Sequence, residues 1–171
     1  QTHSSGYNKL LNTEGFVMAF NEDTRVKIPS LIHLTRLGFV YLSLKNSNFQ
    51  IDPDTNILVN IFEDQLKSIN PNTNSDDIAQ EIQNIREELN YDDLGRAFYN
   101  RLIGKGEGKL RLIDWDNFSK NSFHITTELT CKNGEDEFRP DLTVFVNGLP
   151  LAFGEVKKSK NQEGIKAERD R

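Results

Sequence analysis

The chain has 171 residues, 36% of them hydrophobic and 27% charged, a length and composition that suit one globular domain and exclude disordered or fibrous proteins. No apolar run is long enough to cross a bilayer, and no signal peptide opens the chain. A single cysteine, Cys131, excludes a disulfide framework. We therefore expect an intracellular, cytoplasmic protein with no membrane partner. The formal net charge of −5 argues against a protein that binds nucleic acid over its whole surface, so any contact with DNA must be local.

The first elements expected are a helix and a short strand. Apolar residues recur at helical spacing between residues 26 and 37 and stop at Gly38, and Pro29 fits only if the regular helix begins near it. Residues 39–44 are apolar and aromatic, which is typical of a strand.

A helical insert is expected over about residues 55–104. Its apolar residues form three stripes, the first ended by Pro71 and the second begun by Ser75 or Asp76 as N-cap. The glycine-rich segment 104–109 lacks the spacing of a phosphate-binding loop, so we predict a turn there and no ATP site in this chain.

The last third of the chain changes to strands rich in Ile, Val, Phe and Thr. These are expected at residues 109–115, 122–130, 137–146 and 149–157. Asn133-Gly134 and Asn147-Gly148 are strong hairpin signals between them. We therefore expect an α/β fold, a single domain over 1–171, with a mixed or antiparallel sheet flanked by helices and its catalytic strands within about 122–157.

Three charged residues, Asp141, Glu155 and Lys157, stand inside the last two apolar strands. A buried carboxylate is costly unless it is paired, and a divalent cation is the obvious partner for two of them. We expect Asp141 and Glu155, with the Val156 carbonyl, to bind Mg²⁺ or Mn²⁺. Lys157 would orient or deprotonate the attacking water, or contact the scissile phosphate. Glu-x-Lys alone is a weak signal, because its ordinary explanation is a solvated salt bridge.

The register of this hairpin decides whether the two carboxylates meet. A two-residue Asn147-Gly148 turn in regular register would turn Asp141 and Glu155 to opposite faces of the sheet. A three-residue loop, or an equivalent bulge, would set Asp141 diagonal to Glu155 on one face. We therefore predict the three-residue loop or such a bulge.

The same residues resemble the N-terminal nuclease domain of type I restriction enzyme R subunits, within the PD-(D/E)XK nuclease superfamily. The resemblance is carried by Arg139-Pro140-Asp141, Asn147-Gly148-Leu149-Pro150 and Glu155-Val156-Lys157, and extends upstream through residues 112–117 and 121–123 and the insert around Asn70-Pro71. It covers most of the chain. It implies a restriction-endonuclease-like core and an Mg²⁺-dependent endonuclease that cleaves double-stranded DNA in bacterial host defence.

The resemblance also implies partners and one further site residue. The partners are modification and specificity subunits, and ATP would act only in downstream motor domains that this chain lacks. Since the chain starts at Gln1 without Met and stops in a charged segment, we expect it to be a piece of a longer protein. The family often carries an acidic residue at its first helix. Glu22 is the candidate and Asp23 the alternative, because Lys27 stands where a second Glu would be expected.

Two rival functions remain open at this point. The chain could be a non-catalytic module that keeps the fold to dock DNA or partner subunits, with its carboxylates paired to Lys157. A phosphoesterase acting on small nucleotides is less consistent with the sequence, which shows no phosphate-cradling glycines. Glu128, on a strand near Asp141, could support the site from behind its ligands, but we expect it to be a surface residue.

Overall fold

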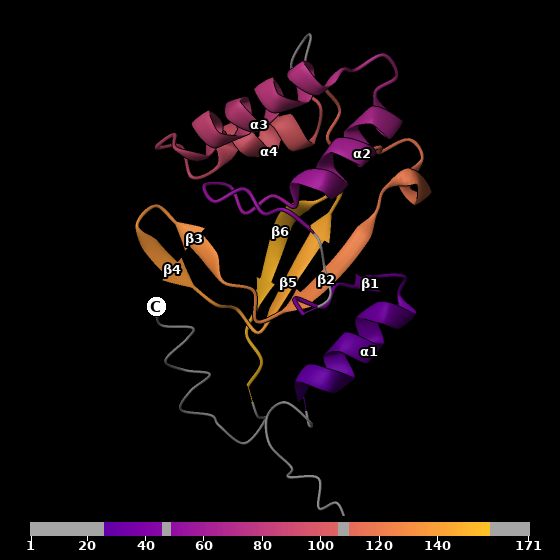
Figure 1. Ribbon diagram of the computed structural model, residues 1–171, viewed down its shortest axis with the longest axis vertical. Coiled ribbons are helices and arrows are strands. Elements are labelled where there is room, and N and C mark those ends of the chain that lie inside the picture. The colour runs from indigo at the N-terminus through magenta and orange to yellow at the C-terminus, as the bar shows by residue number, and fades with distance from the viewer. Residues whose placement is uncertain (1–25, 46–48, 106–109, 158–171) are drawn as a thin grey trace, which may run out of the picture.

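The centre of the molecule is a mixed sheet, seen in a computed structural model that describes residues 26–45, 49–105 and 110–157 (Figure 1). Its strand order is β1-β2-β5-β6, with β1 parallel to β2 and the other neighbours antiparallel. The strands are β1 (Val40–Tyr41), β2 (Phe123–Thr127), β5 (Leu142–Val146) and β6 (Leu149–Gly154). A separate hairpin consists of β3 (Cys131–Asn133) and β4 (Asp136–Phe138). The expected α/β class with a mixed sheet is confirmed.

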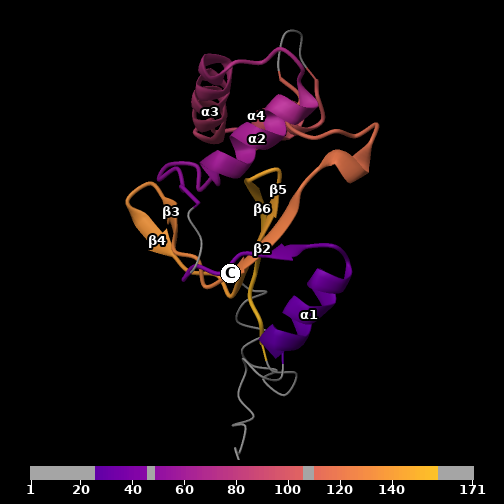
Figure 2. The ribbon, with the colours of Figure 1, turned by 45° about the vertical axis from the view of Figure 1, so that its right-hand side comes forward.

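The sheet is covered on both faces. Helix α1 (Ile28–Arg36) lies against one face, where its Leu31 and Leu34 pack on a cluster that includes Leu142. The β3–β4 hairpin lies on the other side, and Cys131 packs there with Phe145 of β5 (Figure 2). Because alternate residues of a strand point to opposite faces, the apolar side chains of β5 serve both layers.

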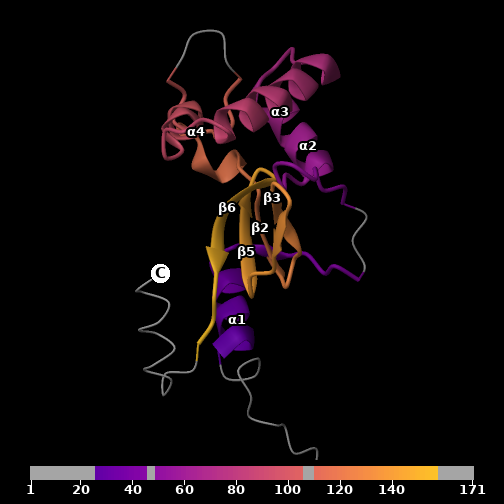
Figure 3. The same ribbon diagram turned by 90° about the vertical axis from the view of Figure 1, so that its left-hand side faces the viewer.

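Three helices stand over one end of the sheet, as the periodicity of the insert predicts. They are α2 (Val59–Ile69), α3 (Ser75–Leu89) and α4 (Arg96–Leu102). They gather at the end that carries the β5–β6 turn, whereas α1 lies toward the opposite end (Figures 1 and 3). In the part of the chain that the structure describes, no helix is both long and apolar enough to cross a membrane.

The N-cap of α3 is one residue earlier than expected. Asn74, not Ser75 or Asp76, accepts a hydrogen bond from the Asp77 N–H, and the Asp77 carboxylate accepts one from the Asn74 N–H. This reciprocal capping box satisfies two helix-terminal donors at once, which a cap at Ser75 would not.

The β5–β6 turn is buried beneath α2 and fixes the insert to the sheet. Asn147 is fully buried, and its amide donates to the Leu112 carbonyl and to Asn121. The Gly148 carbonyl accepts from the Leu58 N–H at 2.9 Å. The Asn-Gly pair is therefore part of the core as well as a turn.

Two expected strands differ in the structure. The described residues 110–115 are not a strand, because the Asp114 carboxylate accepts hydrogen bonds from the Asp116 and Asn117 N–H groups and bends the chain. The strand expected over 137–146 is divided into β4 and β5 by Pro140, which cannot donate to a ladder. The hairpin at Gly134 therefore joins β3 to β4 and leaves the main sheet.

Candidate metal and catalytic site

A β-bulge in the β5–β6 hairpin brings Asp141 and Glu155 together. The turn has two residues, with Asn147 at φ 52° and Gly148 at φ 83°, so the expected three-residue loop is wrong. The equivalent bulge is confirmed: Phe145 pairs with Pro150, but Val144 pairs with Ala152, which leaves Leu151 as the extra residue.

The shifted register places the two carboxylates opposite each other. It continues to Leu142 and Gly154, so the next step along both chains sets Asp141 across from Glu155, directly and not diagonally. Pro150 lacks an N–H donor, and proline within sheets is confined to edges and bulges. Pro150 meets both conditions, because β6 is an edge strand and the extra residue Leu151 follows it.

The Asp141 side chain, 25% exposed, is held by three neighbours. Its Oδ2 accepts from the Val156 N–H at 2.9 Å, its Oδ1 lies 3.1 Å from Lys27 Nζ, and the register sets Glu155 across from it. Burial alone would raise the pKa of Asp141, but the Val156 N–H, Lys27 and Glu155 outweigh it and hold the pKa below its ordinary value.

This lowered pKa makes a prediction about stability. A carboxylate with a depressed pKa stabilises the fold above its unfolded-state pKa, and that contribution is lost as pH falls through the folded-state pKa. With EDTA present, we expect the unsubstituted chain to be more stable than Asp141→Asn near neutral pH, and the difference to shrink in acid. Urea unfolding of both proteins over a pH series measures it, and a difference that grows in acid would contradict the assignment.

Glu155 and Lys157 lie side by side at the end of β6. Their charged groups are 3.8 Å apart, and the side chains are 47% and 37% exposed. The surface pair Glu137 and Lys132 is nearly identical, at 3.9 Å, so this distance alone distinguishes no site from a surface ion pair. The position of Glu155 across from Asp141 in the register is what separates the two cases.

Glu128 and Lys27 also belong to this cluster. The Glu128 side chain is 43% exposed, as expected of a surface residue, but it also supports the site, which was the alternative. The Glu128 carboxylate contacts Lys27 Nζ at 2.7 Å and also pairs with Arg139. The backbone N–H of Glu128 donates to the Asp141 carbonyl. Hydrogen bonds from Lys27 and Arg139 lower the pKa of Glu128. Its backbone φ of 54°, which turns the chain here, leaves no recognisable mark in the sequence.

The donors at this site fit a small divalent cation. Mg²⁺ is usually held by one or two carboxylates and completed by water, and Asp141 with Glu155 supplies two. Two carboxylates that face each other across a sheet repel, and a divalent cation between them would offset that repulsion. Within the described ranges no group of three His, Cys, Asp or Glu residues is clustered for metal binding. Glu22, the further acidic candidate, lies outside the described residues, as does its alternative Asp23.

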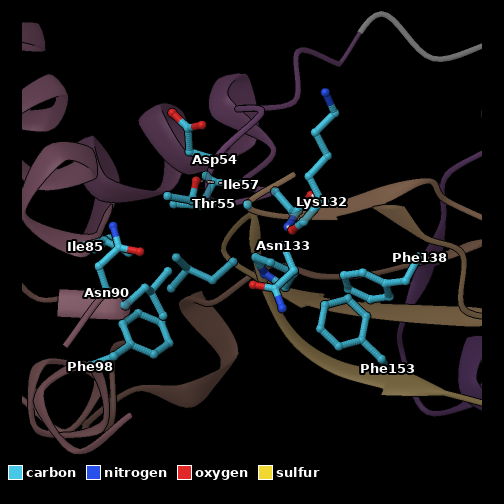
Figure 4. Close-up of a pocket in the computed structure, with 15 residues that line it drawn as sticks. Asp54, Thr55, Ile57, Ile85, Asn90, Phe98, Lys132, Asn133, Phe138 and Phe153 are labelled. Carbon is cyan, nitrogen blue, oxygen red and sulfur yellow. Dashed lines mark hydrogen bonds between the residues drawn. The ribbon is translucent and has the colours of Figure 1, made fainter. Parts of the chain in front are cut away.

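A separate pocket of about 380 Å³ lies between the insert and the β3–β4 hairpin (Figure 4). Phe98, Phe138 and Phe153 form part of its wall. Asp54 is the only carboxylate among its described lining residues. The pocket therefore offers no carboxylate pair for hydrolysis, in contrast to the end of β6.

Comparisons with known proteins agree with one another. A family model described as the type I restriction enzyme R protein N terminus matches residues 19–170. The chain is 30% identical, over 85% of its length, to a putative type I restriction enzyme MjaIXP endonuclease subunit of Methanocaldococcus jannaschii. It is 29% identical, over 68% of its length, to the putative type I restriction enzyme MjaVIIIP endonuclease subunit of the same organism. It spans 16% and 12% of the length of these two relatives.

Proposed function

Because the chain belongs to the family of type I restriction enzyme R protein N termini, we propose that it is the DNA-cleaving part of such a protein. In this proposal it hydrolyses phosphodiester bonds of double-stranded DNA with Mg²⁺ or Mn²⁺. The ATP-driven motor and the modification and specificity subunits would be supplied from outside this chain. The observation that supports the proposal best is the register shift at the bulge, which sets Asp141 across from Glu155.

Each residue of the site has a role in this proposal. Asp141, Glu155 and the Val156 carbonyl would hold the cation, which when bound neutralises phosphate charge and lowers the pKa of water. The Val156 N–H keeps Asp141 ionised and fixes the orientation of its carboxylate. Lys157, beside Glu155, would orient the attacking water or donate to a phosphate oxygen as negative charge develops.

The rival proposal is a non-catalytic module that docks DNA or subunits. In that case the pairs Lys27–Asp141 and Lys157–Glu155 would be ion pairs without a chemical role. The two proposals differ in what happens when one member of the site is neutralised. Only the first requires that DNA cleavage be lost.

Glu155→Gln in the full-length protein, assembled with its partner subunits, tests the proposal. We expect the rate of Mg²⁺-dependent plasmid cleavage to fall roughly a hundredfold, because one of two charged metal ligands becomes neutral. Glu137→Gln is the matched control, since Glu137 forms the equivalent exposed pair with Lys132. It should cleave at the unsubstituted rate.

A second matched pair, Lys157→Met and Lys132→Met, separates the role of the lysine from a general effect of charge. Cleavage should fall only in the first. Equal cleavage by Glu155→Gln and Glu137→Gln would support the docking module and refute the nuclease assignment.

A further inference from the structure

Lys27 reaches the site from the helix side of the sheet. It is the N-cap residue of α1, its side chain is 13% exposed, and its ammonium lies 2.7 Å from Glu128 Oε1 and 3.1 Å from Asp141 Oδ1. Helix α1 is anchored by Leu31 and Leu34 on the apolar cluster of the sheet. The backbone of Lys27 is therefore held in place by a helix that packs against the sheet.

The position of this ammonium conflicts with metal binding at Asp141. Oδ2 of Asp141 already accepts from the Val156 N–H, and Oδ1 faces Lys27. A divalent cation on the same carboxylate would meet a like charge at short range, in a partly buried setting where screening by water is reduced. The ammonium and the divalent cation cannot both contact this carboxylate, so one of them must move away.

Glu128 provides a place for the ammonium to go. Its carboxylate is closer to Lys27 than that of Asp141, and Arg139 holds it from the other side. A small movement of a flexible lysine side chain toward Glu128 would break the contact with Asp141 and keep the charge paired.

We propose that Lys27 is an internal counter-cation of the site, which occupies Asp141 before a divalent cation binds and is displaced toward Glu128 when it does. Lys27 thereby sets the affinity of the site for the metal ion. The inference rests on the proposed function, because it takes Asp141 as a metal ligand.

The test is a calorimetric titration of the 171-residue chain with Mn²⁺ alone. An opposite charge at this distance changes the cation affinity of a carboxylate by roughly tenfold or more, so Lys27→Met should lower the Kd for Mn²⁺ by about tenfold. Lys27→Arg keeps the charge and should bind like the unsubstituted chain. Lys132→Met removes one surface charge and should leave the Kd unchanged. An unchanged or higher Kd in Lys27→Met overturns the inference.

A second variant tests the same inference in the opposite direction. Glu128→Gln removes the carboxylate toward which Lys27 would move, so it should raise the Kd for Mn²⁺, and it should have no effect once Lys27 is Met. If Lys27→Met does not fold, as circular dichroism would reveal, Glu128→Gln decides alone, and an unchanged Kd overturns the inference.

Asp141→Asn separates this inference from the proposed function. If it abolishes Mn²⁺ binding while Lys27→Met changes nothing, the metal site stands and only the role of Lys27 is refuted. If the unsubstituted chain does not bind Mn²⁺, or Asp141→Asn binds it equally well, the metal site itself is refuted together with the role of Lys27.

Discussion

Asp141→Asn is expected to slow Mg²⁺-dependent DNA cleavage by the full-length protein about a thousandfold, a larger loss than for Glu155→Gln. Asp141 is the less exposed carboxylate, at 25% against 47%, and its Oδ2 accepts a hydrogen bond from the Val156 N–H. Asparagine keeps the shape and one oxygen but cannot supply the negative charge that a hard cation requires. Plasmid cleavage at saturating Mg²⁺ measures the effect.

ATP hydrolysis by the same protein is the control for this substitution. In the proposed arrangement the motor lies outside the chain, so Asp141→Asn should leave ATP hydrolysis intact while cleavage is lost. A protein that retains both activities would show that these residues are not the nuclease site. Loss of both would point to a folding defect, which the stability series with EDTA detects independently.

Gly148→Ala is expected to destabilise the chain by about 3 kcal/mol or more. Gly148 has φ 83°, and a Cβ there would lie 2.8 Å from both the Leu58 carbonyl oxygen and the Phe62 nitrogen. These are backbone atoms at the start of α2 and cannot rotate away, so the turn and the helix would have to separate. The free energy of unfolding in urea measures the loss.

Gly134→Ala is the matched control for this effect. Gly134 also lies in a hairpin turn with positive φ, at 62°, but a Cβ there would meet nothing within 4 Å. Only the backbone strain remains, so the loss should be about 1 kcal/mol. Equal losses at the two glycines would show that the contact between the turn and α2 contributes little.

The helices and the class of fold could be predicted because the hydrophobic periodicity is a local property. The stripes of the insert gave α2, α3 and α4, and Gly38 marked the end of α1. Residues 110–115 could not be predicted in the same way. They have the composition of a strand, but hydrogen bonds of the Asp114 carboxylate and the Asn121 amide hold them in turns. Such side-chain hydrogen bonds leave no trace in the hydrophobic periodicity.

The carboxylate pair could be reduced to a question of register, but the answer needed the structure. For Asp141 and Glu155 to lie on the same face, the hairpin needed either a three-residue loop or a bulge. The structure has the bulge, at Leu151. Lys27 could not be placed in advance. It is far from Asp141 in sequence, and the packing of α1 against the sheet brings them together. The metal and catalytic roles of Asp141, Glu155, Val156, Lys157 and Glu22 remain predictions.

Because β6 contains an extra residue, the number of residues between the turn and Glu155 decides which face of the sheet Glu155 occupies. Adding or removing one residue in this interval would rotate Glu155 and Lys157 together to the opposite face, although all three charged residues would still be present. When related chains are compared, the parity of this interval is therefore as informative as the residues themselves. A relative with the three charges but a different parity, and no compensating bulge, would have lost the site without losing its motif.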